Sequence, residues 1–236
     1  VPLFAVRLLA TFMMLPTHSG ATSGGARLSF VYNPGVAPLK FESESGDAIG
    51  LFADFWRLWS EKAGVSVDLV RAPGLNESLE YLRTGSADIH AGVFRTPERE
   101  SYLAFSAPIL SLDYFLFSHP AIRRVRTLDD TSGLIVGIAT SGYTQDFLWA
   151  RLPASRIAFY DDFDALFRAA MRGDVKVFVS TKIGLNYFLG QNRLSNIFSF
   201  DESAPLFSQV YCAAVSRDRA DLLPLINDGL GKISVR

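Results

Sequence analysis

Two long extended segments constrain the fold of this chain more than any other feature. Residues 109–118 form an apolar stretch with no helix after it, and residues 205–216 form a second one just before the C-terminal helix. Strand and helix patterns alternate before the first segment and again between the two. A chain that leaves one α/β unit, builds a second and returns needs two such crossings. The sequence therefore predicts a bilobal α/β protein; a single doubly wound domain, which would not need the crossings, is the alternative.

Hydrophobic periodicity divides the rest of the chain into strands and helices. In the first half we expect strands at 28–32, 65–70 and 89–93, a turn at 33–35, and helices at 51–63 and 77–84. In the second half we expect strands at 134–139, 157–160, 175–179 and 197–200, and helices at 144–152, 164–171, 183–189 and 218–233. Because strands and helices alternate in both halves, each unit should hold a largely parallel sheet.

The composition excludes several classes of protein. The chain has 236 residues, of which 49% are hydrophobic and 20% charged, as in a globular protein. A net charge of −1 argues against a nucleic-acid-binding surface, which needs clustered excess lysine and arginine. The single cysteine, Cys212, lies in an apolar run as a buried thiol, and the three histidines show no ligand spacing. We therefore expect no disulfide, no metal site and no cofactor.

The N-terminal segment has the pattern of an export signal. Arg7 precedes the apolar run 8–15, and small and polar residues follow from 17 to 25. A charged start, a short apolar core and a small-residue exit are typical of a secretory signal, and the run is shorter than the ~20 apolar residues of a membrane span. We therefore expect residues 1–25 to be a signal peptide or N-terminal anchor; an amphipathic surface helix or a first strand is the alternative.

Residues 85–108 place an arginine where open α/β sheets bind ligands. Gly85 ends a helix, residues 89–93 form a buried strand, and residues 96–99 are Thr-Pro-Glu-Arg, with threonine at a cap position and proline at the first helical position. Arg99 is therefore expected on a short helix just past the C-terminal end of a strand, which is the edge where such sheets bind ligands. Pairing with a neighbouring glutamate is the alternative role for this arginine.

These patterns resemble the family 3 periplasmic solute-binding proteins, which include the lysine/arginine/ornithine-, histidine- and glutamine-binding proteins. The likeness covers nearly all of residues 27–233, and its matching segments are 50–54, 85–88, 96–99, 105–108, 128–130, 136–138 and 173–174. The resemblance implies a type II periplasmic-binding-protein fold, with two α/β lobes, two crossing segments and a ligand cleft between the lobes. We expect lobe 1 to comprise residues 26–113 and 208–236, and lobe 2 to comprise residues 114–207.

The same resemblance implies roles for particular residues. In amino-acid binders of this family the arginine at the position of Arg99 grips the ligand's α-carboxylate, a role that suits a guanidinium fork. A hydroxyl residue usually stands two positions before Thr96; here it is Phe94, which keeps the backbone N–H and adds a ring. In lobe 2 the turn at 141–143 (Ser-Gly-Tyr) offers backbone N–H groups. The predicted ligand-binding residues are Arg99, Phe94, Thr96, Gly142, Tyr143, Thr181, Tyr32 and Asn33.

One position departs from the amino-acid-binding pattern. The family places an aspartate for the ligand's ammonium group after the strand that follows the turn at 173–174, and in this chain Thr181 stands there. Burying an unpaired ammonium group is costly. The hypothesis is therefore a small carboxylate or another polar metabolite, held by Arg99 and bounded by Phe94 and Tyr143.

The sequence favours a binding domain over an enzyme. It contains no Gly-x-Ser-x-Gly elbow and no glycine-rich phosphate motif between a strand and a helix. We expect periplasmic binding of a solute by cleft closure, as the sensor domain of a membrane-bound signalling protein. A free solute-binding component of an ABC transporter, with a permease as partner, is the alternative. A cleft enzyme resembling cyclohexadienyl dehydratase comes after both, because Thr181 stands where an acid is needed.

Overall fold

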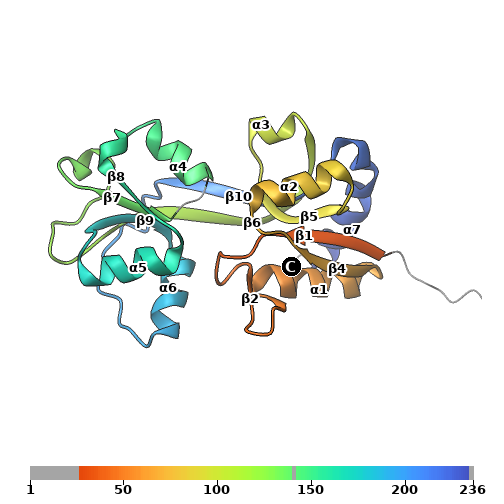
Figure 1. The fold of residues 1–236 in the computed structure, drawn as a ribbon, viewed down its shortest axis with the longest axis horizontal. Coiled ribbons are helices and arrows are strands. Elements are labelled where there is room, and N and C mark those ends of the chain that lie inside the picture. The colour runs from red at the N-terminus through yellow and green to blue at the C-terminus, as the bar shows by residue number, and fades with distance from the viewer. Residues whose placement is uncertain (1–26, 140–141, 234–236) are drawn as a thin grey trace, which may run out of the picture.

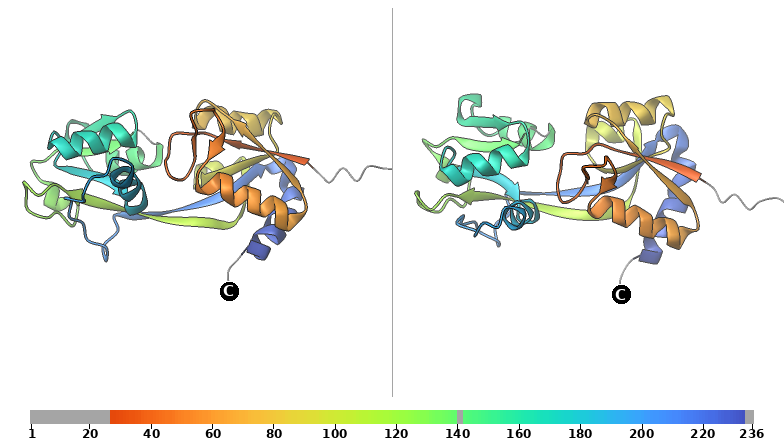
Figure 2. Two further views of the ribbon diagram at one scale, coloured as in Figure 1. Left: turned by 90° about the horizontal axis from the view of Figure 1, so that it is seen from below. Right: turned by 60° about the horizontal axis from the view of Figure 1, so that its bottom comes forward.

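Two groups of strands and helices lie at opposite ends of a pair of long strands (Figure 1, Figure 2). The structure, a computed structural model, describes residues 27–139 and 142–233, so the predicted signal or anchor at 1–25 lies outside the described residues. Lobe 1 contains β1 (Arg27–Tyr32), β2 (Phe41–Glu42), β3 (Ala48–Ile49), α1 (Leu51–Ala63), β4 (Ser66–Arg71), α2 (Leu75–Thr84), β5 (Ile89–Phe94), α3 (Pro97–Glu100) and α7 (Leu223–Ile233). Lobe 2 contains β7 (Val136–Ala139), α4 (Gly142–Trp149), β8 (Ile157–Tyr160), α5 (Phe163–Arg172), β9 (Val177–Thr181) and α6 (Lys182–Gln191). The long strands are β6 (Leu103–Ser118) and β10 (Phe207–Ser216).

One eight-stranded sheet runs through both lobes, in the order β4-β1-β5-β10-β6-β9-β7-β8. The strands β4, β1 and β5 of lobe 1 are parallel, and so are β8, β7 and β9 of lobe 2. β6 and β10 are antiparallel to each other, from Phe207 opposite Tyr114 to Ser216 opposite Leu103. These two strands are the crossings that the sequence predicts, and each lobe holds a largely parallel sheet.

Lobe 1 is packed on both faces of its sheet. Phe30 of β1 contacts Trp56 and Trp59 of α1, at ring-centroid distances of 4.5 and 5.6 Å. Val31, the next residue of the strand, packs in a separate cluster with Leu82 of α2. Because successive side chains of a strand point to opposite faces, a strand that is apolar at consecutive positions needs helices on both sides.

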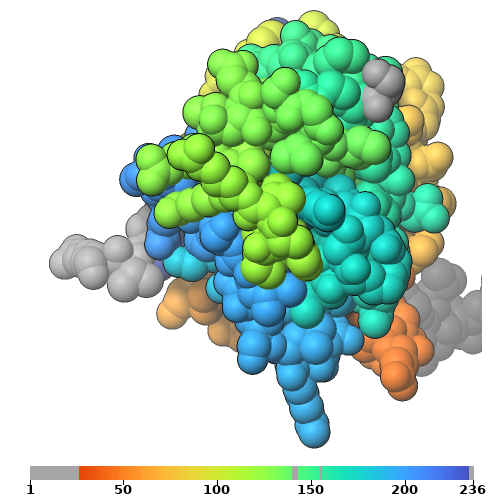
Figure 3. All heavy atoms as spheres, turned by 90° about the vertical axis from the view of Figure 1, so that its left-hand side faces the viewer, coloured from red at the N-terminus to blue at the C-terminus, as the bar shows by residue number. Residues whose placement is uncertain are grey.

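Phenylalanine rings fill one side of lobe 2. Phe117 of β6 stacks on Phe178 of β9 at 5.2 Å, and Phe167 of α5 lies edge-on to Phe178 at 5.9 Å. Phe188 of α6 lies 5.2 Å from Phe167. Burying one such ring contributes about 1.5–3 kcal/mol, so the cluster holds α5 and α6 on the same face of the sheet. Figure 3 looks onto the outer end of this lobe, where the green segment between β6 and β7 covers part of the surface.

No helix within residues 27–139 and 142–233 is both long and apolar enough to cross a membrane.

Two of the expected elements are wrong. The strand expected at 197–200 is only a single bridge between Ser199 and Ser118, because Asn196 Oδ1 accepts the Phe198 backbone N–H (2.9 Å) that a ladder would use. The helix expected at 218–233 is divided into a 3₁₀ segment, η3 (Arg217–Leu222), and the α-helix α7. Pro224 lacks an N–H and its ring clashes with a preceding helical turn, so the α-helix begins next to it.

Candidate functional site

The parallel strands of the two lobes point their carboxyl ends at each other. β5 and β6 both run antiparallel to β10, so β5 ends in the direction in which β6 leaves lobe 1. β9 runs antiparallel to β6 and therefore ends facing lobe 1. Since ligands of open α/β sheets bind outside the carboxyl ends of the strands, the space between the lobes is the candidate site.

Arg99 follows β5 on the short helix α3 and has no acidic partner among the described residues. Thr96 caps this helix, because its Oγ1 accepts the Arg99 backbone N–H at 3.3 Å. One guanidinium N–H of Arg99 donates to the Phe94 carbonyl at 2.8 Å. The neighbouring Arg95 is paired with Glu100 at 2.5 Å, whereas no carboxylate of the described residues lies within 4.0 Å of the Arg99 guanidinium. The remaining N–H groups of Arg99 are therefore available to an anion.

Lys40 is a second cation that has no acidic partner among the described residues, and it is not one of the predicted ligand-binding residues. Its side chain is buried in lobe 1, where Nζ donates to Asn33 Oδ1 at 2.8 Å and to the Gly92 carbonyl at 3.4 Å. No carboxylate in the described part of the chain lies within 4.0 Å of Nζ. Burial, and then the charge of Arg99, lower the Lys40 pKa to about 7. No sequence pattern marks this lysine, because its burial depends on how the loop at 33–41 folds against β5.

Aromatic rings from both lobes meet beside the two cations. Phe94 lies 4.2 Å from Tyr211 of β10 and 6.3 Å from Tyr143 of α4, measured between ring centroids. Tyr143 also lies 5.4 Å from Phe207. Lys40 Nζ lies 5.7 Å from the centroid of the Tyr211 ring. Phe94 from lobe 1 and Tyr143 from lobe 2 therefore come together, and Phe94 packs on Tyr211, the ring beside Lys40.

Tyr32 and Asn33, at the end of β1, have different surroundings. Asn33 belongs to the cationic group, because its Oδ1 accepts the hydrogen bond from Lys40. Tyr32 is buried in the core of lobe 1, and its hydroxyl donates to Glu42 Oε1 at 3.3 Å. The Tyr32 hydroxyl therefore bonds to Glu42 of β2 and not to Arg99.

In lobe 2, two of the predicted residues lie at helix starts. Thr181 ends β9 and caps α6, since its Oγ1 accepts the Gly184 backbone N–H at 3.1 Å. Gly142 is the first residue of α4, and Ser141, the other member of the predicted turn, lies outside the described residues. The Thr181 hydroxyl is therefore engaged by its own helix as a hydrogen-bond acceptor.

His90 lies behind the cations as a neutral ring. Its Nδ1 accepts the Gly92 backbone N–H at 3.1 Å, so the proton resides on Nε2, which is 3.0 Å from Ser78 Oγ. Burial, followed by the charges of Lys40 and Arg99, holds the His90 pKa well below its ordinary value. Within the described residues, no group of three or more His, Cys, Asp or Glu side chains is placed to hold a metal ion. The positive charge of the site therefore comes from Arg99 and Lys40.

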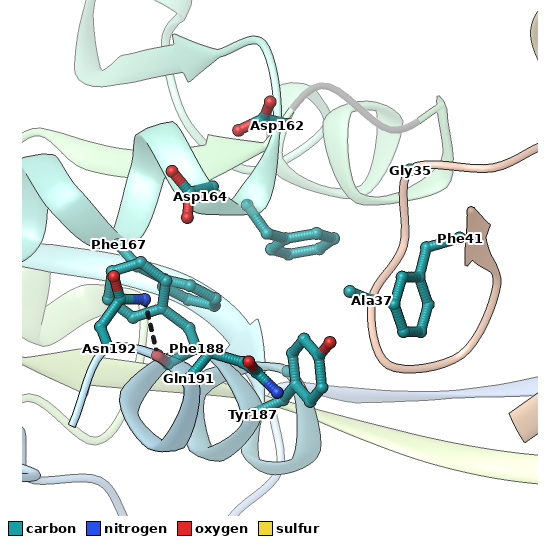
Figure 4. A pocket seen from close by; sticks show the side chains of 12 residues that line it. Gly35, Ala37, Phe41, Asp162, Asp164, Phe167, Tyr187, Phe188, Gln191 and Asn192 are labelled. Carbon is teal, nitrogen blue, oxygen red and sulfur yellow. Dashed lines mark hydrogen bonds between the residues drawn. The ribbon is translucent and has the colours of Figure 1, made fainter. Parts of the chain in front are cut away.

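An open pocket of about 330 Å³ lies elsewhere between the lobes. It is bounded by Gly35, Ala37 and Phe41 of lobe 1, and in lobe 2 by the first half of α5 and by one side of α6 from Gly184 to Gln191 (Figure 4). None of the eight predicted residues lines this pocket. The open volume and the unpaired cations are thus in different parts of the inter-lobe space.

Sequence relatives of the chain are much longer proteins. The virulence sensor protein BvgS of Bordetella pertussis is 21% identical over 190 residues, which are 78% of this chain and 15% of BvgS. BvgS of Bordetella bronchiseptica is 20% identical over the same length. The chain therefore spans about 15% of the length of the curated relatives that it matches.

Solved structures share the fold at low sequence identity. A histidine kinase sensor domain with similarity to periplasmic binding proteins has a TM-score of 0.75 and 20% identity, covering 89% of this chain and 90% of that one. The arginine-bound form of truncated ArgBP from T. maritima has a TM-score of 0.71 and 22% identity, covering 89% and 97%. The BvgS VFT2 domain of Bordetella pertussis has a TM-score of 0.71 and 19% identity, covering 88% of each chain. These likenesses confirm the predicted fold class, a bilobal fold of the type II periplasmic-binding-protein kind.

The family assignment follows from almost the whole described chain. Residues 28–235 match the family described as bacterial extracellular solute-binding proteins, family 3. The match includes both lobes, both crossing strands and the closing helix α7. The chain therefore belongs to the bacterial extracellular solute-binding proteins, family 3.

Proposed function

We propose that this domain binds a small carboxylate-bearing solute between its lobes, outside the cytoplasm, as the sensor domain of a membrane-bound signalling protein. The observation that carries the proposal is the pair of cations, Arg99 and Lys40, that have no acidic partner within 4.0 Å among the described residues. Other arginines near the cleft do have partners; Arg95, for example, is paired with Glu100. A carboxylate bound between the lobes would supply the missing negative charge.

The physical chemistry of the two cations favours a carboxylate. A guanidinium fork matches the two oxygens of a carboxylate, and charge-assisted hydrogen bonds of this kind are roughly twice as strong as neutral ones. Lys40 is buried, so its charged form is disfavoured without a counter-ion. An anion close to both groups would satisfy Arg99 and favour the charged form of Lys40 at the same time.

An α-amino acid is a poorer candidate than a carboxylate without an ammonium group. The acid that amino-acid binders of this family use is replaced by Thr181, whose Oγ1 already accepts a hydrogen bond from α6. The groups beside the cations are the rings of Phe94, Tyr143 and Tyr211. Such rings suit an apolar or aromatic part of a ligand, as binding pockets combine apolar walls with few polar groups.

Closure of the cleft would couple binding to a signal. Lobe 1 holds the anion through Arg99 and Lys40, and lobe 2 adds Tyr143 only when the lobes approach each other. A ligand shifts such an equilibrium by the contacts that it makes in one state and not in the other, so lobe 2 determines the size of the shift.

The sensor context rests on the relatives. BvgS is a virulence sensor protein, and one structural neighbour is a histidine kinase sensor domain. Both support an extracytoplasmic domain joined to a membrane-bound signalling module. The alternative, a free solute-binding component of a transporter, keeps the same cleft chemistry and differs in the partner.

Calorimetry with matched variants tests the carboxylate site. We expect aliphatic and aromatic carboxylates to bind and their amides not to bind. Arg99→Ala should weaken carboxylate binding by about 2–5 kcal/mol, which is the usual effect of truncating one partner of a buried charge pair. Arg95→Ala, which removes an arginine already paired with Glu100, is the control and should leave affinity unchanged. A panel in which only zwitterionic amino acids bind, or an Arg99→Ala variant with unchanged affinity, would contradict the proposal.

A further inference from the structure

The open pocket between Phe41 and α6 has chemistry opposite to that of the cationic site. Its walls are mainly aromatic: Phe41 of lobe 1 lies 5.7 Å from Tyr187 of α6, edge-on, and Phe163 and Phe167 of α5 line the opposite side. Figure 4 shows Phe41 next to Tyr187 of α6, with Phe167 of α5 farther from Phe41. At about 330 Å³ the pocket falls within the range of small-molecule sites, which is roughly 300–1,000 Å³.

The charge in this pocket is negative. Asp162 and Asp164 line it, and no lysine, arginine or histidine is among the lining residues. Asp164 is paired with Arg168 of the same helix at 2.5 Å. Asp162 accepts the Ala165 backbone N–H through Oδ1 at 2.8 Å, and no lysine or arginine in the described part of the chain lies within 4.0 Å of its carboxylate. Arg168 is close enough for the Asp162 charge to act on it, but its ion pair is with Asp164. One Asp162 oxygen at the edge of the pocket is therefore left for another cation.

The helix start beside the pocket does not favour an anionic ligand. The amino end of a helix attracts negative charge, but the first turn of α5 already carries Asp162 as its cap and Asp164 next to it. An anionic ligand would meet these two carboxylates at close range. A cation would meet the Asp162 carboxylate and the faces of aromatic rings, both of which attract positive charge.

We infer that this pocket binds an organic cation, an amine with an apolar or aromatic body, at a subsite distinct from that of Arg99 and Lys40. The amine pairs with Asp162, and the apolar body packs against Phe163 and Phe167 of α5 and against the contacting rings of Phe41 and Tyr187. The inference goes beyond the proposed function and shares no residue with the carboxylate site, so each can fail without the other. A ligand held here contacts both lobes and therefore favours their close approach.

A charge series on one ring tests the inference. Calorimetry on the whole chain compares 2-phenylethylamine, 2-phenylethanol and phenylacetate, which share the ring and differ in charge. We expect the amine to bind, and Asp162→Asn to weaken it roughly fivefold, as for a partly exposed ion pair. Asparagine caps a helix as well as aspartate does, so this substitution removes the charge and keeps the start of α5. Asp161→Asn, one residue away and outside the pocket, is the matched control.

A second variant separates pocket chemistry from folding. Phe41→Leu keeps an apolar side chain and removes the ring, and we expect it to weaken the amine by roughly two- to fivefold with an unchanged thermal unfolding midpoint. Arg99→Ala should leave amine binding intact, whatever it does to carboxylates. The inference is overturned if phenylethylamine does not bind, if phenylethanol binds equally well, or if Asp162→Asn and Asp161→Asn behave alike.

Discussion

The two lobes contribute different chemistry to the space between them. Lobe 1 holds two cations with no acidic partner in the part of the chain that the structure describes, Arg99 after β5 and Lys40 in the loop before β2. Lobe 2 presents hydroxyl and carboxylate groups that already cap helices, Thr181 on α6 and Asp162 on α5, together with the ring of Tyr143.

If the domain binds a carboxylate as proposed, this difference separates recognition from closure. Unpaired cations in a buried or half-buried position are costly without an anion, so lobe 1 would gain most from a carboxylate. The polar groups of lobe 2 that cap its helices gain less, and its contribution is mainly apolar contact. Substitutions in lobe 1 should therefore change the affinity and its pH dependence, and substitutions in lobe 2 should change stability or the final closing contacts.

After Arg99→Ala, the largest effect on carboxylate binding is expected for Lys40→Met. Loss of hydrogen bonds from a charged group costs about 1.5–3 kcal/mol, which corresponds to roughly a tenfold to hundredfold loss of carboxylate affinity. The Lys40 pKa is about 7 in the free protein. An anion that binds beside Lys40 favours its charged form, so the protein takes up a proton when the anion binds. The affinity of the natural chain should therefore fall as the pH rises above about 7, and calorimetry between pH 6 and 9 should find this dependence lost in Lys40→Met.

Among the groups around the site, Lys40 is the one expected to change its charge between pH 6 and 9, because the pKa values of its neighbours are shifted away from this range. The His90 pKa is held well below its ordinary value by burial, and the Tyr211 pKa is raised well above its own by burial. In the unfolded chain Lys40 titrates near ~10.4, so between pH 7 and 10 the unfolded state binds more protons than the native state. The free energy of unfolding of the ligand-free domain should then increase with pH between about pH 7 and 10. In Lys40→Met this increase should be smaller. A natural chain whose affinity and stability are both independent of pH would argue against a buried Lys40.

Most of the fold could be predicted because its signals are local. Gly64 and Gly85 end helices α1 and α2 where expected, each with a positive φ. The start of β6 could not be predicted, because Pro108 interrupts the strand pattern; the structure places this proline at a shift of register opposite Cys212. Proline is tolerated at such a bulge, so the strand continues back to Leu103.

The candidate site could be predicted only in part, for a physical reason. Arg99 is marked by its own cap and helix start, which are contacts within a few residues. Lys40 depends on packing against Gly92 of β5, and the pocket at Phe41 depends on Tyr187. These partners are far apart in the sequence, and no periodic pattern encodes their approach.

Thr181 allows the helix-capping assignment in lobe 2 to be tested directly. Thr181→Ala removes the acceptor of the Gly184 N–H and should lower the free energy of unfolding by about 1 kcal/mol, the typical cost of losing a cap. Thr181→Ser keeps the acceptor and should match the natural chain in urea unfolding. Equal loss in both variants would mean that the methyl group, and not the hydroxyl, matters at this position.

The smallest effect on carboxylate affinity is expected at Tyr143, where lobe 2 closes on lobe 1. Its ring lies 6.3 Å from Phe94 and 5.4 Å from Phe207, and aromatic pairs of this kind contribute about 0.5–1.5 kcal/mol. Tyr143→Ala should weaken carboxylate binding by that amount, whereas Tyr143→Phe should retain most of the affinity. Trp149→Ala, which removes an exposed ring from the same helix, is the control and should have no effect. Because Tyr143 contributes only when the lobes are together, the loss should come from faster dissociation, measurable by stopped-flow or surface plasmon resonance. A slower association rate with unchanged dissociation would instead make Tyr143 part of the first encounter, and recognition would then belong to both lobes.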